Sequence, residues 1–241
     1  MKKVVLLSLF ALLFLTVGAF AADVTDFYAG DFDSNNPNAN GLANENDAIV
    51  GGSPYGAATF QNFSTANPLT IDDLFTNNLS TLTPTSAYWE IRTGLSEGNG
   101  GTLIASGTGS GGNFTHTPTS RSGFGYTEYT DEVTGVNLTV GPGTYWFAVV
   151  PQALTQSGRS FNSNTFDAGR ILGPGITTTD NMQFWNSAFF GANFTNANNE
   201  GVFQAFSSGF SISSVPEPSS FIMLATGLIG AAGVVRRRLS R

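Results

Sequence analysis

The feature that most constrains the fold is a series of short β-type runs separated by Gly, Pro, Asn and Ser, with no sustained helical periodicity. In the clearest example, "TGVNLTVGPGTYWFAVV", Val136, Leu138 and Val140 alternate with polar residues before a Gly-Pro-Gly stretch at 141–143. Alternation with a period of two is typical of a strand with one buried face. The Gly-Pro-Gly stretch predicts a turn that folds the chain back as a hairpin.

Further runs rich in β-branched and aromatic residues extend along the chain, at 57–63, 69–75, 87–93, 102–107, 123–129, 133–140, 144–151, 181–192 and 201–212. The segment "AYWEIRTGLSEGNGGTLIASGTG" predicts a second hairpin with a wide Gly-rich connection. This succession of strands and turns predicts an all-β fold over residues 57–214, a β-sandwich of jelly-roll type with long loops. Residues 22–56 are rich in Asn, Asp and Gly and predict an irregular N-terminal arm.

The chain has no cysteine, which excludes disulfides, thiolate metal sites and cysteine nucleophiles. Stability must therefore come from packing. With 21 Phe, 6 Tyr and 3 Trp residues available, we expect most aromatic side chains to fill the space between the two sheets.

Residues 1–21 have the pattern of a secretory signal peptide. Lys2 and Lys3 form a short positive region, an almost wholly apolar stretch follows, and small residues at Ala19 and Ala21 have the spacing that signal peptidase recognises. The alternative is an uncleaved N-terminal anchor. Because the cleavage pattern is good, we expect residues 1–21 to be removed on export.

Setting both ends aside changes the charge of the chain. The part between the signal peptide and the C-terminal tail has four arginines, no lysine and sixteen acidic residues, a net charge near −12. Such a surface repels phosphate backbones, so we expect no nucleic-acid partner.

Two glycine-containing motifs fit known sites in spacing only. Residues 94–98 match G-x-S-x-G, but a Gly-rich turn and another strand follow instead of a helix. The only histidine, His116, is predicted to lie in a polar loop. Residues 107–112 match G-x-G-x-x-G without the helix that would present its amides to a pyrophosphate. Neither motif predicts an active site.

Glu128, Asp131 and Glu132 are close enough in sequence to raise the hypothesis of a carboxylate pair for glycoside chemistry. Their clustering instead predicts solvated turn residues. We therefore expect a protein without enzymatic activity. An enzyme acting on glycans would need a deep cleft that holds two carboxylates or His116.

A calcium ion is the one cofactor that the sequence raises as a hypothesis. Asp31, Asp33 and Asn35 place oxygen donors at alternate positions, as the opening of an EF-hand-like loop does, and Asp47 follows within reach. In a twelve-residue EF-hand loop counted from Asp31, position six would be Gly and position twelve Glu. Here these positions are Asn36 and Leu42, so the full pattern fails. The alternative is a solvated acidic loop.

Four aromatic residues, Trp89, Trp146, Trp185 and Tyr126, are candidates for a platform on which sugar rings stack. Adjacent strand residues face opposite sides of a sheet, so one member of each of the pairs 88–89 and 145–146 points away from the core. This is the basis for a carbohydrate-binding hypothesis.

The C-terminal tail, residues 215–241, has three parts in order. Pro216, Glu217 and Pro218 precede the uncharged run 221–235, and Arg236, Arg237 and Arg238 follow it. Fifteen residues span about 22 Å as a helix, short of a bilayer core of about 30 Å. We expect a single hydrophobic helix, a transmembrane-like segment that holds the protein at the membrane transiently, with the arginines on the cytoplasmic side.

This order of parts closely resembles the PEP-CTERM sorting signal. The resemblance implies an exosortase as partner, a multi-pass membrane transpeptidase of Gram-negative bacteria that recognises the Pro-Glu-Pro motif and cleaves near it. It also implies that Pro216, Glu217 and Pro218 are the recognition residues. Two prolines agree with that role, because they keep the segment extended and free of helix.

The resemblance implies export across the inner membrane, a transient membrane-held stage, and then the cell surface or the medium. The family is tied to exopolysaccharide and biofilm production. We therefore expect a structural or adhesive component of the surface or matrix, with an exopolysaccharide-binding module as the alternative.

The sequence predicts that the mature protein lacks both ends. The intact mass of the protein recovered from the envelope or medium of its native host should correspond to a chain without residues 1–21, cut near Pro216 to Pro218. Recovery of a mature species that still ends at Arg241 would contradict the sorting interpretation and favour a plain tail anchor.

Overall fold

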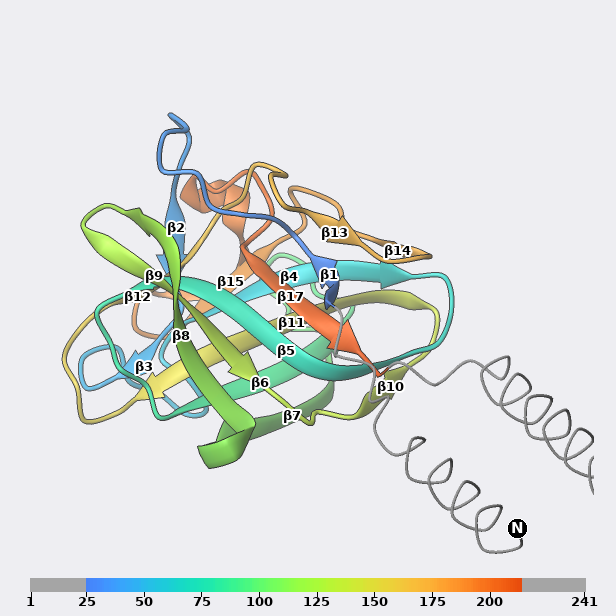
Figure 1. Cartoon of the computed structure of the whole chain (residues 1–241), viewed down its shortest axis with the longest axis horizontal. Coiled ribbons are helices and arrows are strands. Elements are labelled where there is room, and N and C mark those ends of the chain that lie inside the picture. Colours follow the sequence, from blue (N-terminus) through green and yellow to red (C-terminus); the bar gives the residue numbers. More distant parts are fainter. Residues whose placement is uncertain (1–24, 214–241) are drawn as a thin grey trace, which may run out of the picture. The chain divides into compact units, whose positions relative to one another are not determined.

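Two β-sheets packed face to face make up residues 25–213, the part of the chain that the computed structural model describes (Figure 1). The predicted signal peptide and the predicted C-terminal helix lie outside these residues. Within 25–213 there is no α-helix, only two 3-10 turns, η1 (Gly111–Asn113) and η2 (Ala197–Glu200). The prediction of an all-β sandwich is confirmed, and its finer assignment to the jelly-roll type stays a prediction.

The nine-stranded sheet contains β1 (Thr25–Tyr28), β2 (Gly41–Ala43), β5 (Leu69–Ser80), β8 (Phe114–Gly123), β9 (Tyr126–Val133), β10 (Leu138–Val140), β12 (Ser160–Ser163), β13 (Ile171–Leu172) and β17 (Ser208–Ile212). The eight-stranded sheet contains β3 (Asn46–Asp47), β4 (Ala58–Thr65), β6 (Ser86–Thr93), β7 (Thr102–Ser110), β11 (Gly143–Ala153), β14 (Ile176–Thr177), β15 (Phe184–Ser187) and β16 (Ala192–Asn196). All these strands pair antiparallel except the short β3, which lies parallel to β11.

Strand β5 organises the nine-stranded sheet. One of its edges pairs with β17 and then β12, and the other pairs with β10 and then β9. In Figure 1, β5 crosses the molecule as one long twisted strand with β17 (orange-red) beside it. Its twelve residues therefore set the register of four neighbouring strands.

The stretch that most clearly predicts a hairpin does not form one. Strand β10 pairs with β5, whereas β11 pairs with β4 and β6 in the other sheet. The turn at 141–143 thus carries the chain between sheets, next to the β4–β5 connection, as the registers Val140 with Leu69 and Gly143 with Thr65 show. Two alternating runs joined by a turn are compatible with a hairpin in one sheet and with a crossing between two sheets. The local sequence therefore could not distinguish the two arrangements. The predicted β6–β7 hairpin is confirmed.

The described part of the predicted irregular arm, residues 25–56, contains three short strands. Its first four described residues form β1, with Phe27 fully buried, and β2 and β3 follow. The β-sandwich therefore begins at Thr25 rather than at residue 57. The main partner of β1 is β17, near the other end of the domain, and a pairing over that separation leaves no local signal in the sequence.

The core between the sheets is aromatic. Phe210 of β17 lies 5.1 Å from Phe27 of β1, 4.8 Å from Phe63 of β4 and 5.9 Å from Phe147 of β11, measured between ring centroids. Two of these four strands belong to each sheet. The expectation that aromatic side chains fill the space between the sheets is confirmed for this cluster.

Beside the aromatic core, buried amides join the two sheets. Asn162 of β12 donates to Thr59 Oγ1 of β4 at 2.9 Å, and Asn44 donates to Asn78 Oδ1 of β5 and to Val149 O of β11. All of these side chains are buried. Hydrogen bonds of this kind connect the sheets in a chain that has no cysteine.

Phe210→Ala should destabilise the protein by about 3–5 kcal/mol, because it removes a ring that contacts both sheets and leaves a cavity. Denaturant unfolding followed by tryptophan fluorescence would measure the loss. Phe203→Ala is the matched control: this ring is 53% exposed, so the change should stay within about 0.5 kcal/mol. Equal effects of the two substitutions would contradict this description of the core.

Candidate functional site

The outer face of the nine-stranded sheet carries two hollows in line. Alternate residues of β9, namely Tyr126, Thr130 and Glu132, lie on this face, as do their neighbours Leu79, Asn77 and Phe75 on β5. From Tyr126 to Glu132 a strand rises about 20 Å. Both hollows therefore lie along the same two strands, although no residue lines both.

The first hollow has a volume of about 230 Å³ and is mainly apolar. It is lined by Asn40, Gly41, Leu79, Phe124, Tyr126 and Phe161. The rings of Tyr126 and Phe161 meet edge to face at 5.6 Å. Aromatic rings and one amide thus surround an open apolar floor, the composition typical of a small-ligand site.

Phe124 lies at the lip of this apolar hollow in an unusual conformation. It occupies the β8–β9 turn with φ of 54°, followed by Gly125 with φ of 85°, and its side chain is 64% exposed. Positive φ is costly for a bulky residue, and Asn or Gly is preferred there. One side of the ring contacts Phe32 at 6.0 Å between centroids, and the rest is open to solvent. A largely exposed apolar ring at a strained position is a feature of functional surfaces.

The second hollow is a polar groove of about 330 Å³. Its walls are formed by Thr25, Tyr28, Asp31, Phe75, Asn77, Arg121, Thr130, Glu132 and Ile171. The rings of Tyr28 and Phe75 lie 5.6 Å apart. Asn77 donates to the Tyr28 hydroxyl and accepts from Thr130, so the floor of the groove is fixed by hydrogen bonds.

Arg121 lines the polar groove and is held by two carboxylates. Its guanidinium lies 2.6 Å from Asp31 Oδ1 and 2.6 Å from Glu128 Oε2, and it donates to the Tyr28 hydroxyl at 3.4 Å. Burial raises the pKa of Glu128, and the positive charge of Arg121 opposes that rise. Burial also raises the pKa of Tyr28, so its phenol stays protonated and donates to Asp31.

A second ion pair, between Arg159 and Glu45, lies next to Phe161, which lines the apolar hollow. The Arg159 guanidinium lies 4.6 Å from the Phe161 ring and 5.6 Å from the Phe190 ring, and it pairs with Glu45 at 3.0 Å. Glu45 also accepts from the Ser160 amide. Burial raises the pKa of Glu45 to about 7 from its ordinary value near 4.5.

Of the four predicted platform residues, only Tyr126 lies in a hollow. Trp146 and Trp185 are buried and donate to the carbonyls of Met182 and Ala43, and Trp89 packs against the main core. The prediction of a joint platform is therefore wrong. Tyr126 and the tryptophans belong to different sheets, and the segment around Phe184 covers the outward face of β11 at Trp146.

The predicted calcium ligands have separate partners. Asp31 binds Arg121, Asp33 accepts from the amide of Asn35, and buried Asp47 accepts from the amides of residues 49, 50 and 158. Within residues 25–213, no group of three or more Asp, Glu, His or Cys side chains has the arrangement of a metal site. The structure does not bring the four predicted residues to one point.

The predicted solvated turn at 128–132 is wrong. These residues lie in β9, where Glu128 and Asp131 are fully buried on opposite faces of the sheet. Two carboxylates on opposite faces cannot flank one glycosidic bond. Sequence clustering suggested a turn because the alternating strand pattern here is made of polar residues.

His116 also lies in a strand rather than in a loop. It is part of β8, bonds Asp131 Oδ1 at 2.6 Å through Nδ1, and stacks on Tyr129 at 4.2 Å. Burial raises the pKa of Asp131, against the effect of His116. Ser96 is in the β6–β7 connection of the other sheet, so the structure does not join these residues into a catalytic dyad.

Sequence reasoning missed Arg121, Tyr28, Phe75 and Asn77. Arg121 comes from β8, whose sequence "FTHTPTSRSG" places threonines at alternate positions. That polar alternation was the available signal for the strand. Tyr28, Phe75 and Asn77 come from distant strands that meet only in the folded sheet.

Residues 214–238 match the family model described as the PEP-CTERM protein-sorting motif. The chain carries a PEP-CTERM sorting motif. This motif implies processing by an exosortase, and PEP-CTERM proteins are exported and processed at the membrane toward the cell surface. The predicted recognition residues lie outside the described part of the chain, as do the arginines at 236–238. No curated protein and no solved structure matches this chain.

No helix in the described range 25–213 has the length and apolar character needed to cross a membrane. The predicted transmembrane-like segment 221–235 lies beyond that range.

The pKa of Glu45 predicts that stability depends on pH. Because the folded-state pKa is raised, this group contributes stability below about pH 4.5 that is lost as the pH rises to about 7. The loss is roughly 3 kcal/mol at most. Glu45→Gln should flatten the profile of unfolding free energy between these pH values, as measured by urea unfolding. Glu200→Gln removes an exposed carboxylate and should leave the profile as in the wild type; a wild-type slope in the Glu45→Gln variant would contradict the assignment.

Proposed function

We propose that this PEP-CTERM protein is a non-enzymatic adhesive component of the cell surface or biofilm matrix, and that its sandwich binds polysaccharide along the outer face of the nine-stranded sheet. Phe124 is the observation that carries the proposal. It is a ring 64% exposed beside an aromatic hollow, in contact with the Phe32 ring on one side, and it occupies a positive φ at which Asn or Gly is preferred.

The shape of the surface supports a chain-like ligand. The apolar hollow and the polar groove follow β5 and β9 in line, and Arg121 lines the groove. Aromatic rings cover the apolar faces of sugar rings, and fixed polar groups bond their hydroxyls. An elongated face of this kind suits successive units of a polymer better than a single small molecule.

The charge arrangement supports a binding role rather than glycoside hydrolysis. Glu128 is fully buried against Arg121, so a substrate cannot reach it. Glu128 and Glu132 are four residues apart on one strand, about 13 Å along it, beyond the separations used by glycosidases.

Phe124→Asn tests this function without unfolding the protein. Asn tolerates the positive φ, and this gain offsets the loss of the ring contact with Phe32, so stability should change by no more than about 1 kcal/mol. It should nevertheless lose polysaccharide binding, by about fivefold or more if one stacked ring is removed. Co-sedimentation of the full chain with the polysaccharide of its host would measure the loss.

Phe203→Ala is the control, because it removes another exposed ring that lines neither hollow. Equal binding by the wild type and the Phe124→Asn variant would overturn the role of this hollow. Absence of binding by the wild type to any polysaccharide would overturn the function itself.

A further inference from the structure

The polar groove has one cation, and the protein itself neutralises it. Arg121 binds Asp31 through one terminal nitrogen, Glu128 through Nε, and the Tyr28 hydroxyl through the other terminal nitrogen. Each nitrogen of the guanidinium thus has a partner within the protein. A ligand in the groove finds no free positive charge at Arg121.

The remaining polar groups of the groove favour hydrogen-bond donors. Asp31 is already bonded by Arg121 and by the Tyr28 hydroxyl. Glu132 is a further carboxylate of the groove, and an ionised carboxylate only accepts hydrogen bonds. Thr25 and Thr130 also line the groove. The Tyr28 and Phe75 rings supply the apolar part of the wall. A ligand rich in hydroxyl or ammonium groups on an apolar ring matches this wall, and a ligand rich in carboxylate or sulfate does not.

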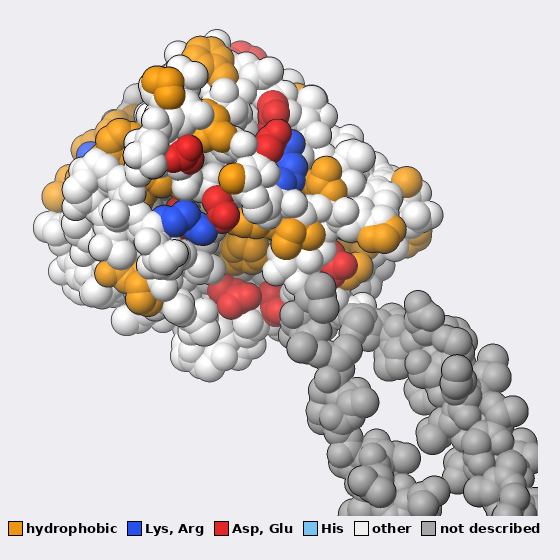
Figure 2. Space-filling model, turned by 45° about the horizontal axis from the view of Figure 1, so that its top comes forward, with side chains coloured by type: hydrophobic (Ala, Val, Ile, Leu, Met, Phe, Trp, Pro, Cys, Tyr) orange, Lys and Arg blue, Asp and Glu red, His pale blue; other side chains and the backbone are white. Residues whose placement is uncertain are grey.

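Elsewhere in the described part of the chain, carboxylates neutralise the arginines in the same way. The four arginines between residues 25 and 213 are all ion-paired, Arg92 with Glu90, Arg121 with Asp31 and Glu128, Arg159 with Glu45, and Arg170 with Asp167 and Asp180. Figure 2 shows arginine side chains (blue) lying directly beside Asp and Glu (red) on the face drawn.

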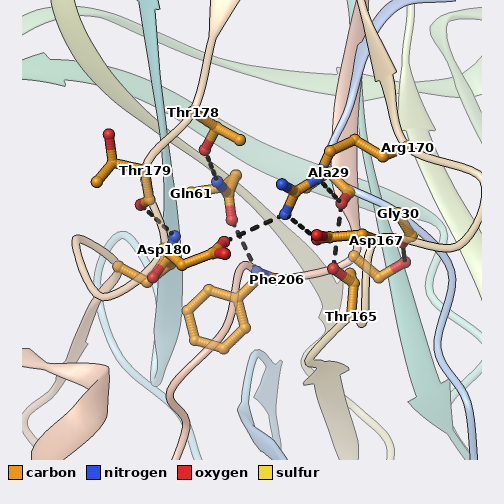
Figure 3. Close-up of polar contacts among 12 residues, drawn as sticks. Ala29, Gly30, Gln61, Thr165, Asp167, Arg170, Thr178, Thr179, Asp180 and Phe206 are labelled. Atoms are coloured by element: carbon orange, nitrogen blue, oxygen red, sulfur yellow. Dashed lines mark hydrogen bonds and ion pairs between the residues drawn. The ribbon is translucent and has the colours of Figure 1, made fainter.

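Figure 3 shows the same arrangement in detail at Arg170. Its side chain lies between Asp167 and Asp180 and donates to the Ala29 carbonyl at 3.0 Å, which ties the 165–180 loop to the end of β1. This guanidinium therefore has a structural role and is not available to an anionic ligand.

We propose that the groove binds a neutral or amino-bearing polysaccharide and discriminates against anionic ones such as polyuronates. The proposal rests on the proposed polysaccharide-binding function and names its ligand class. Between residues 25 and 213 there are fifteen acidic residues, four arginines and no lysine. The field of the protein thus attracts ammonium groups toward the groove and repels carboxylates, and the groove's own acceptors bond the ammonium and hydroxyl hydrogens.

The test compares three polymers with the full chain at low ionic strength: chitosan as the amino glycan, dextran as the neutral one, and alginate as the polyuronate. Binding should be tightest to chitosan, weaker to dextran and weakest to alginate. Glu132→Gln should weaken chitosan binding about two- to fivefold and leave dextran binding unchanged.

Glu200→Gln separates the groove from the general charge of the protein, since it removes an exposed carboxylate that does not line the groove. An equal loss of chitosan affinity in both variants would overturn the groove as the site. Alginate binding as tight as chitosan binding would overturn the ligand class while the polysaccharide-binding function stands. If none of the three polymers nor the host polysaccharide binds, both proposals fail.

Discussion

The contact of Phe210 with Phe27, Phe63 and Phe147 is the interaction on which the rest of the structure depends. Without cysteine, the two sheets have no covalent connection other than the chain, so burial of aromatic surface must hold them together. The connections β4–β5 and β10–β11 pass between the sheets side by side and bring β4 and β11 of this cluster into register. Buried amides at Asn44 and Asn162 add directional bonds that fix how the sheets sit on each other.

Side chains alternate along each strand, so one set packs in the core and the other set forms the outer face. On β9, Asp131 and Val133 point inward, while Tyr126, Thr130 and Glu132 point outward. The core fixes the backbone of β9. The positions of the outward side chains are therefore largely fixed as well, at little additional cost in conformational entropy. The pairing of Arg121 with Asp31 and Glu128 adds to this, because it compensates a buried carboxylate and removes the only cation from the groove.

Features that depend on residues close together in the sequence could be predicted, and features that depend on distant partners could not. The all-β class and the β6–β7 hairpin rest on neighbours in sequence, and both are confirmed. The sheet assignment of β10 and β11, the incorporation of β1 and the burial of Trp146 depend on partners far along the chain. Strand β8 was missed because threonine alternates there where apolar residues were expected.

Two properties could be predicted from the sequence alone, namely the sorting of the protein and its all-β fold class. A sorting motif is recognised as a linear segment, and strand periodicity is a local property, so both are legible without a structure. Only the tertiary structure decided the candidate site. Tyr28, Phe75, Arg121 and Tyr126 come from four strands, and a surface made of residues from separate strands exists only once the sheet has set their register.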